Sequence, residues 1–308
     1  MSKFSRRLDQ NIINKLKAEP LFSDCLLPDI EKGHVFPAVR NNRVHFYCGG
    51  RRLFEYTASG FRTHVKFASV LIGKRNGYID ESQLNGVKPI SRFTDGYEAI
   101  KEVCEKYAGE EAKGISSIIS RPEIHTRSTI DRWIIPLDVE ACFNKSNDDE
   151  DDTVDRIDIV FLDADTQKLR FCEAKCYGNR ELWSKRGTRP RVATQLDEYN
   201  KQINERRDEI VQAYVAHVQA LKALLGWDLP EPISIDDEVP LFLLVFGFDA
   251  DQRDGRLKGL LLQDGSLKGY YSYECGDPAS MVLENMWTRV KLRQVVLDQL
   301  CSIGRCAP

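Results

Sequence analysis

Two carboxylates and one lysine in a short stretch of the chain have the types and spacing of a metal-dependent site. Asp158 lies in the run RIDIVFLD, and Glu173 and Lys175 lie in the run RFCEAK that follows it. Both runs are typical of β-strands, whose side chains alternate between faces, so Glu173 and Lys175 share a face that Cys172 and Ala174 do not. If the strands pair as a hairpin, the three charged groups converge on one patch of sheet. Oxygen ligands suit Mg²⁺ or Mn²⁺, and a neighbouring lysine can orient an attacking water.

Two more polar side chains belong to the segment that follows. The run VATQLDEYNKQI opens a predicted amphipathic helix that extends to about Leu225 and ends at Gly226. Gln195 and Tyr199 are four residues apart and therefore share one face of this helix. Tyr199 also falls in the apolar stripe of the helix, so its position is compatible with a role in the core and with a role beside the site.

A further carboxylate, Glu140, lies in IIPLDVEACF, which we predict to be the first strand of the same sheet. Strand alternation places Glu140 on the same face as Asp138. The sequence does not say which face that is. Glu140 is therefore a secondary candidate for the metal site, as Tyr199 is for the helix.

The ordered set of Asp158, the triplet EAK at 173–175 and the pattern QxxxY at 195–199 resembles the PD-(D/E)xK nuclease superfamily, in particular its exonuclease-like branch. No proline precedes Asp158, although one is common there in the family. The resemblance implies a restriction-endonuclease-like core, in which helices flank a central sheet and the first helix often carries an acidic residue near the metal. It implies a metal-dependent phosphodiesterase with Asp158 and Glu173 as Mg²⁺ or Mn²⁺ ligands and Lys175 beside the attacking water. Gln195 and Tyr199 would support the site.

The most basic stretch of the chain connects the EAK triplet to the QxxxY helix. It contains Arg180, Lys185, Arg186, Arg189 and Arg191. Its position beside the carboxylates favours contact with nucleic-acid phosphates. The alternative is a surface loop whose charge serves solubility.

The N-terminal third of the chain has a different pattern of predicted elements. A helical lead-in to about residue 30 precedes four runs typical of β-strands between residues 34 and 71, the last of them FRTHVKFASVL. Turn residues at 41–42 and 49–50 indicate a small β-meander. Its exposed side carries basic residues from Arg40 to Lys66 among aromatic ones, which suits nucleotide contact. An ordinary solvated sheet face is the interpretation we favour, because both residue types are normal on half-buried strands.

The remaining segments complete a mixed sheet. We expect a loop over 72–92, a helix over about 97–107 capped by Asp95, a buried strand over 240–249, a strand near 269–274 and a helix over about 278–300. Residues 110–131 have no readable pattern. The predicted fold is therefore α/β with an α+β-like mixed sheet, divided into a β-rich accessory domain (1–92) and a nuclease-like domain (93–308).

Composition and charge limit the classes of protein to which the chain can belong. The chain has 308 residues, a formal net charge of −3 and nine cysteines, none of them in a CxxC pair. Any attraction to nucleic acid must therefore be local, and dispersed thiols indicate a reduced, cytoplasmic protein. We expect no membrane association, because no apolar run has the length of a membrane span.

The expected function is a Mg²⁺-dependent nuclease acting on DNA rather than RNA. The resemblance by analogy suggests an effector in bacterial antiviral defence, controlled by a regulatory partner, an activating signal or self-association. The alternatives are a non-catalytic nucleic-acid-binding subunit with a nuclease-like fold, and a surface ion-pair cluster on a protein of another function.

Overall fold

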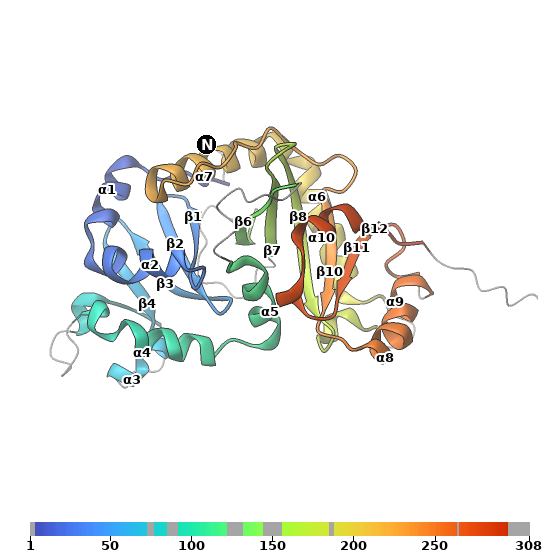
Figure 1. Ribbon diagram of the computed structural model, residues 1–308, viewed down its shortest axis with the longest axis horizontal. Helices are drawn as coiled ribbons and strands as arrows, with labels where there is room; N and C mark the ends of the chain where they lie inside the picture. Colours follow the sequence, from blue (N-terminus) through green and yellow to red (C-terminus); the bar gives the residue numbers. More distant parts are fainter. Residues whose placement is uncertain are drawn as a thin grey trace, which may run out of the picture.

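The chain is a mixed α/β protein with one antiparallel sheet and one mixed sheet, and helices flank both in the computed structural model (Figure 1). The structure describes residues 4–72, 77–84, 92–121, 132–143, 156–184, 188–263 and 265–294, with backbone alone at 69–72. One cluster of buried apolar side chains includes members from both sheets. The division into residues 1–92 and 93–308 stays a prediction.

The first sheet confirms the predicted meander, with the strand order β1-β2-β3-β4-β5. Its strands are β1 (Phe36–Arg40), β2 (Arg43–Cys48), β3 (Arg51–Thr57), β4 (Gly60–His64) and β5 (Tyr78–Asp80). Asn42 and Gly49 have φ values of 55° and 57° in the predicted turns, a left-handed conformation that asparagine and glycine tolerate best.

The fourth predicted strand is wrong in its second half, because helix α3 (Val65–Ile72) begins directly after His64. Val65 and Ala68 are both fully buried and are three residues apart, which is helical spacing. The region expected to be a loop contains β5 and a short 3₁₀ helix (Glu81–Leu84).

Helical segments before the first sheet confirm the predicted lead-in. They are α1 (Gln10–Ala18), a π-helical turn (Leu21–Leu26) and α2 (Leu27–Glu31). Helix α4 (Phe93–Lys106) contacts the same sheet through β2 and β3. Helix α4 begins earlier than expected, with Asp95 in its first turn rather than at its cap. Phe93 is fully buried, and this apolar anchor extends the helix toward its N-terminus.

The second sheet has the order β12-β11-β10-β8-β7-β6, with β9 beside β8. Its strands are β6 (Ile134–Ala141), β7 (Ile157–Asp163), β8 (Lys168–Cys176), β9 (Ser234–Ile235), β10 (Leu241–Phe246), β11 (Tyr271–Cys275) and β12 (Lys291–Leu292). β6, β7 and β8 are antiparallel neighbours, whereas β10 runs parallel to both β8 and β11. The hairpin of β7 and β8 is confirmed, as is the predicted buried strand β10.

Helices cover both faces of the second sheet. α5 (Glu110–Ile119) and α10 (Leu283–Arg289) contribute to the apolar cluster on the face of Cys172 and Ala174. α6 (Arg191–Glu205) and α7 (Arg207–Leu225) contribute to the cluster on the face of Phe171. α7 also contacts β1, and it runs along the upper edge of the molecule in Figure 1.

The single helix predicted to extend to Leu225 is wrong, because Arg206 breaks it with φ −131° and ψ 23°. The Arg206 guanidinium donates to the carbonyl oxygen of Phe143 and pairs with Glu209 at 2.8 Å. Contacts to another part of the chain therefore outweigh helix continuity at this residue. Gly226 ends α7 as predicted, with φ 76°.

The C-terminal helix predicted over 278–300 is also wrong. α10 ends at Arg289, and β12 then pairs with β11. The backbone N–H of Arg293 donates to the carbonyl oxygen of Tyr270 at 2.8 Å, so this segment bonds to the sheet edge rather than to itself. Residues 295–308 lie outside the described part. The sequence did not predict α8 (Ala250–Gln252), the π-helical turn (Arg253–Leu257) or α9 (Lys258–Leu262).

Helix α5 lies against both sheets through two glycine contacts. A Cβ atom on Gly50, in the β2–β3 turn, would lie 2.1 Å from the carbonyl oxygen of Ala112. A Cβ atom on Gly114 would lie 2.2 Å from the ring of Phe246 in β10. Both distances are too short for any side chain, so these glycines allow the close approach that places α5 between the sheets.

All seven cysteines in the described ranges are free thiols. Among the helices of those same ranges, none combines the length and the apolar character needed to cross a bilayer.

Candidate active site

Asp158 and Glu173 lie on neighbouring strands, as predicted. The register of β7 and β8 pairs Ile159 with Cys172, which places Asp158 and Glu173 next to each other across the hairpin. The Asp158 carboxylate accepts a hydrogen bond from the backbone N–H of Ala174 at 2.7 Å. Strand alternation directs Glu173 toward the face of the sheet that α6 covers, because it shares the parity of Phe171.

Lys175 is the centre of an ion-pair network. Its Nζ atom lies 2.7 Å from Glu173, 3.3 Å from Glu181 and 3.9 Å from Glu111. Burial alone would lower the pKa of Lys175, but the carboxylates of Glu173, Asp158 and Glu111 raise it above its usual value. The ammonium is therefore charged at neutral pH and is held in one position.

The two strand carboxylates resist ionisation. Burial raises the pKa of Asp158 to about 7, although Lys175 and the Ala174 N–H oppose that shift. Burial and the neighbouring Asp158 raise the pKa of Glu173 well above its usual value. The Oε2 atom of Glu173 is buried and has no hydrogen-bond partner among the described residues. Removing these carboxylates from water is unfavourable unless a cation compensates for it, so this pair is suited to holding a divalent ion.

Gln195 and Tyr199 lie on the buried face of α6, as the four-residue spacing predicted. The Tyr199 hydroxyl donates to the carbonyl oxygen of Arg156 at 3.0 Å. Arg156 directly precedes β7, so this bond fixes the entry to the strand that carries Asp158. Tyr199 is thus a core residue that also positions the site.

Asp138 and Glu140 keep the predicted alternation in the ladder with β7, where Asp138 pairs with Val160 and Ala141 with Ile157, but their surroundings differ. The register shift of β6 lies before Asp138, and Glu140 itself has φ 49°. Asp138 is fully buried and contacts Tyr214 of α7 at 3.0 Å. Glu140 instead lies 3.8 Å from Arg156 and raises the pKa of Asp158 through its charge.

Like Glu181, Glu111 is a site residue that the sequence did not reveal. It lies in the first turn of α5, and its Oε2 atom accepts hydrogen bonds from the backbone N–H of Cys176 at 3.1 Å and from the Asn179 side chain at 2.7 Å. The signal that could have found it is the pair of glutamates that follows Gly109, since acidic residues favour a helix N-terminus.

The basic segment is placed only in part. Arg189 pairs with Asp197 and with the hydroxyl of Tyr270, and Arg191 lies 3.2 Å from Glu181. Arg180 is exposed. Lys185 and Arg186 lie outside the described residues. The role of the segment in nucleic-acid contact stays a prediction.

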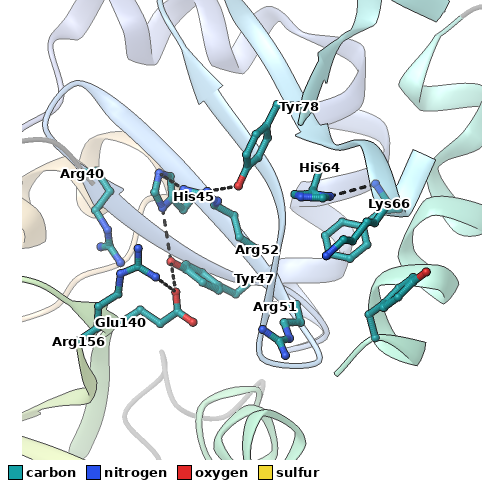
Figure 2. Close-up of a pocket in the computed structure, with 12 residues that line it drawn as sticks. Arg40, His45, Tyr47, Arg51, Arg52, His64, Lys66, Tyr78, Glu140 and Arg156 are labelled. Carbon is teal, nitrogen blue, oxygen red and sulfur yellow. Dashed lines mark hydrogen bonds and ion pairs between the residues drawn. The ribbon is translucent and has the colours of Figure 1, made fainter. Parts of the chain in front are cut away.

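Two cavities meet beside these carboxylates. One has a volume of about 230 Å³ and is lined by Asp158, Glu111 and Glu140 together with Tyr47 and Arg51. A second, of the same volume, lies toward the first sheet and shares Tyr47, Arg51 and Glu140 with it (Figure 2). Arg40, expected on the exposed side of the meander, is fully buried and bonds to Asp138 at 2.6 Å, so that expectation was wrong.

The donor set fits a magnesium ion only in part. Asp158 and Glu173 supply two carboxylates, and Mg²⁺ commonly completes its octahedron with waters and substrate oxygens. No group of three histidine, cysteine or acidic residues within the described ranges has the geometry of a metal site. Protein families, curated proteins and solved structures provide no match to this chain.

Proposed function

We propose that the chain is a metal-dependent nuclease with Asp158, Glu173 and Lys175 at its catalytic centre. The observation that carries the proposal is the pair of repelling carboxylates on adjacent strands, with Lys175 2.7 Å from one of them. Raised carboxylate pKa values beside a cavity are typical of functional sites. The resemblance to the PD-(D/E)xK superfamily agrees with this arrangement. In chain order α5 directly precedes the three antiparallel strands, and it brings the carboxylate of Glu111 to 3.9 Å from Lys175.

Each group has a defined role in this proposal. Asp158 and Glu173 would hold Mg²⁺ or Mn²⁺. When bound, the ion polarises the scissile phosphate and lowers the pKa of a coordinated water. Lys175 orients the attacking water or neutralises the charge that develops on the phosphate. Glu111 and Glu181 hold the lysine. Gln195 and Tyr199 support the site from the buried face of α6.

The substrate we propose is DNA, which the basic residues around Arg180 and the cavities beside Asp158 would contact. A role as an effector in bacterial antiviral defence rests on the resemblance alone. The net charge of −3 means that binding relies on these local basic groups and falls steeply with salt.

The test is cleavage of supercoiled plasmid, linear duplex, single-stranded DNA and RNA, each with Mg²⁺, Mn²⁺ or EDTA. Lys175→Ala should lose at least ~100-fold of the metal-dependent rate, the scale of one electrostatic catalytic group. Lys201→Ala is the control, because that lysine is exposed on α6 and lies 3.9 Å from Glu205. Rates are expressed per folded molecule, with the melting temperature as the check. Cleavage that Lys175→Ala leaves intact, or that persists in EDTA, would contradict the proposal.

One observation favours the second candidate, a non-catalytic nucleic-acid-binding subunit. Lys175 is already surrounded by the carboxylates of Glu173, Glu181 and Glu111, so the network compensates its own charge. Salt-sensitive DNA binding without cleavage under any metal condition would support this candidate against the nuclease.

A further inference from the structure

The cavity toward the first sheet is strongly cationic, and we call it the cationic pocket. Its arginine and lysine side chains outnumber its carboxylates by five to one: Arg40, Arg51, Arg52, Lys66 and Arg156 against Glu140. Figure 2 shows these side chains around one space, and they come from β1, β3, α3 and the segment before β7. A concave surface lined by one sign of charge concentrates ions of the opposite sign.

Neighbouring carboxylates cancel only part of this charge. Arg40 is neutralised by Asp138 at 2.6 Å. Arg52 shares the single buried carboxylate of Glu55, 3.8 Å away, with two other arginines, Arg43 and Arg62. Arg51 is exposed, and no described carboxylate pairs with its guanidinium. The pocket therefore carries a net positive charge at neutral pH.

Aromatic rings form part of the wall between these charges. The Tyr78 ring lies 5.1 Å from the Arg52 guanidinium and 5.2 Å from that of Arg62. The ring of His64 meets Tyr78 edge-on at 5.2 Å. Cationic groups that bind phosphate beside rings that can stack on a base are the combination that recognises nucleotides.

The size of the pocket limits what it can hold. Its volume is about 230 Å³, which is close to the lower end of small-molecule sites at ~300 Å³. That space suits one phosphorylated nucleotide and excludes a double helix. We propose that the cationic pocket binds a free nucleotide through its phosphates. This inference does not depend on the nuclease proposal.

Glu140 lies between the cationic pocket and the cavity that Asp158 lines. Glu140 lines both cavities, and it is contacted by the Tyr47 hydroxyl at 3.4 Å and by Arg156 at 3.8 Å. A phosphate that attracts Arg156 loosens its pairing with Glu140. Occupation of the cationic pocket therefore leaves the Glu140 carboxylate less compensated by Arg156. Because that carboxylate acts on Asp158, the pocket is suited to regulating the site.

Binding is measured by isothermal titration calorimetry with ADP, GDP, CDP and UDP, in EDTA so that no metal contributes. At least one nucleotide should bind, and unphosphorylated nucleosides should not. Arg51→Ala should weaken binding by at least ~10-fold, the scale of one charge-assisted hydrogen bond. The double variant Arg51→Ala/Lys66→Ala should weaken it further. Both side chains are exposed, so both variants should fold.

Arg7→Ala is the matched control, because Arg7 is an exposed arginine outside the pocket. It should bind as the unmodified protein does. Failure of all four nucleotides to bind, or equal binding by the double variant, would overturn the proposal. A 5′-phosphorylated single-stranded oligonucleotide forms a second arm. Its displacement by a free nucleotide supports the assignment, whereas oligonucleotide binding that no nucleotide displaces would make the pocket part of a polynucleotide surface.

Discussion

The Glu111 carboxylate accepts a hydrogen bond from the backbone N–H of Cys176, at 3.1 Å, and so ties the first turn of α5 to the end of β8. The same side chain lies 3.9 Å from Lys175. A residue in a segment without a readable pattern thus completes the surroundings of the predicted site.

Glu111→Gln should reduce metal-dependent cleavage by about 10-fold, because the charge that helps hold Lys175 is lost while a hydrogen-bond acceptor remains. The melting temperature should change little. Glu110→Gln is the control, since Glu110 is exposed in the same helical turn. An equal loss of activity in both variants would assign the effect to the helix terminus and not to Glu111.

The metal-free protein should lose stability as pH rises from about 4 to about 7 through the carboxylate of Asp158. Its pKa is about 7 in the folded state and 3.8 in a model peptide, so the folded state binds the extra proton in that window. The contribution amounts to at most about 4 kcal/mol. Burial lowers the pKa of both His45 and His217 to about 4, and these residues act in the opposite direction.

Comparison with Asp158→Asn reports the Asp158 carboxylate together with its effect on the pKa of Glu173, because both proteins keep the histidines. Chemical denaturation in EDTA at several pH values should show the variant gaining stability relative to the unmodified protein as pH rises. Parallel pH profiles would contradict the raised pKa.

Gly50→Ala should destabilise the protein by about 2–4 kcal/mol, through the left-handed backbone and through collision with Ala112. Gly226→Ala is the matched control, since Gly226 has φ 76° against 74° for Gly50 and no atom within 4 Å of its added Cβ. It should cost only about 1 kcal/mol. Denaturant midpoints compare the two variants. Equal losses of stability would mean that α5 moves to accommodate the added methyl group at little cost.

Asp138→Ala should cost about 3–5 kcal/mol, because it leaves two buried arginines without their carboxylate. Asp138 bonds to Arg6 at 2.9 Å and to Arg40 at 2.6 Å. Asp9→Ala removes exposed contacts with Arg7 and Asn42 and should change the unfolding free energy by less than ~1 kcal/mol. A small effect of Asp138→Ala would show that water reaches the arginines.

Tyr199→Phe should lower stability by about 1 kcal/mol, the net value of one hydrogen bond, here to the carbonyl oxygen of Arg156. Its cleavage rate should fall far less than that of Lys175→Ala, because it acts only on the position of β7. A loss as large as that of Lys175→Ala would show that the Tyr199 hydroxyl takes part in the reaction.

Period-two alternation was enough to predict that Glu173 and Lys175 share one face of their strand, and the hairpin of β7 and β8 then brings Asp158 beside Glu173. The near-continuous apolar run of β10 likewise predicted a strand buried on both faces. Local patterns of this kind predict side-chain placement correctly where a strand contains no bulge or break.

Long-range contacts decided the features that the sequence did not predict. The positive φ of Glu140 and the two buried arginine partners of Asp138 are examples. Arg206 breaks a helix because its guanidinium contacts Phe143. The position of Glu111 depends on Gly50 and Gly114, which allow α5 to approach both sheets. No local pattern encodes which distant segment a residue meets.

The buried bridge from Arg40 to Asp138 joins β1 of one sheet to β6 of the other, with Arg6 of the N-terminal segment on the same carboxylate. Separating the two sheets along that seam would break these ion pairs together with the hydrogen bond from the Arg40 guanidinium to the carbonyl oxygen of Val139. The bridge therefore opposes hinge motion between the sheets at this point. The cavities on either side of Glu140 are thus framed by strands that are fastened to each other.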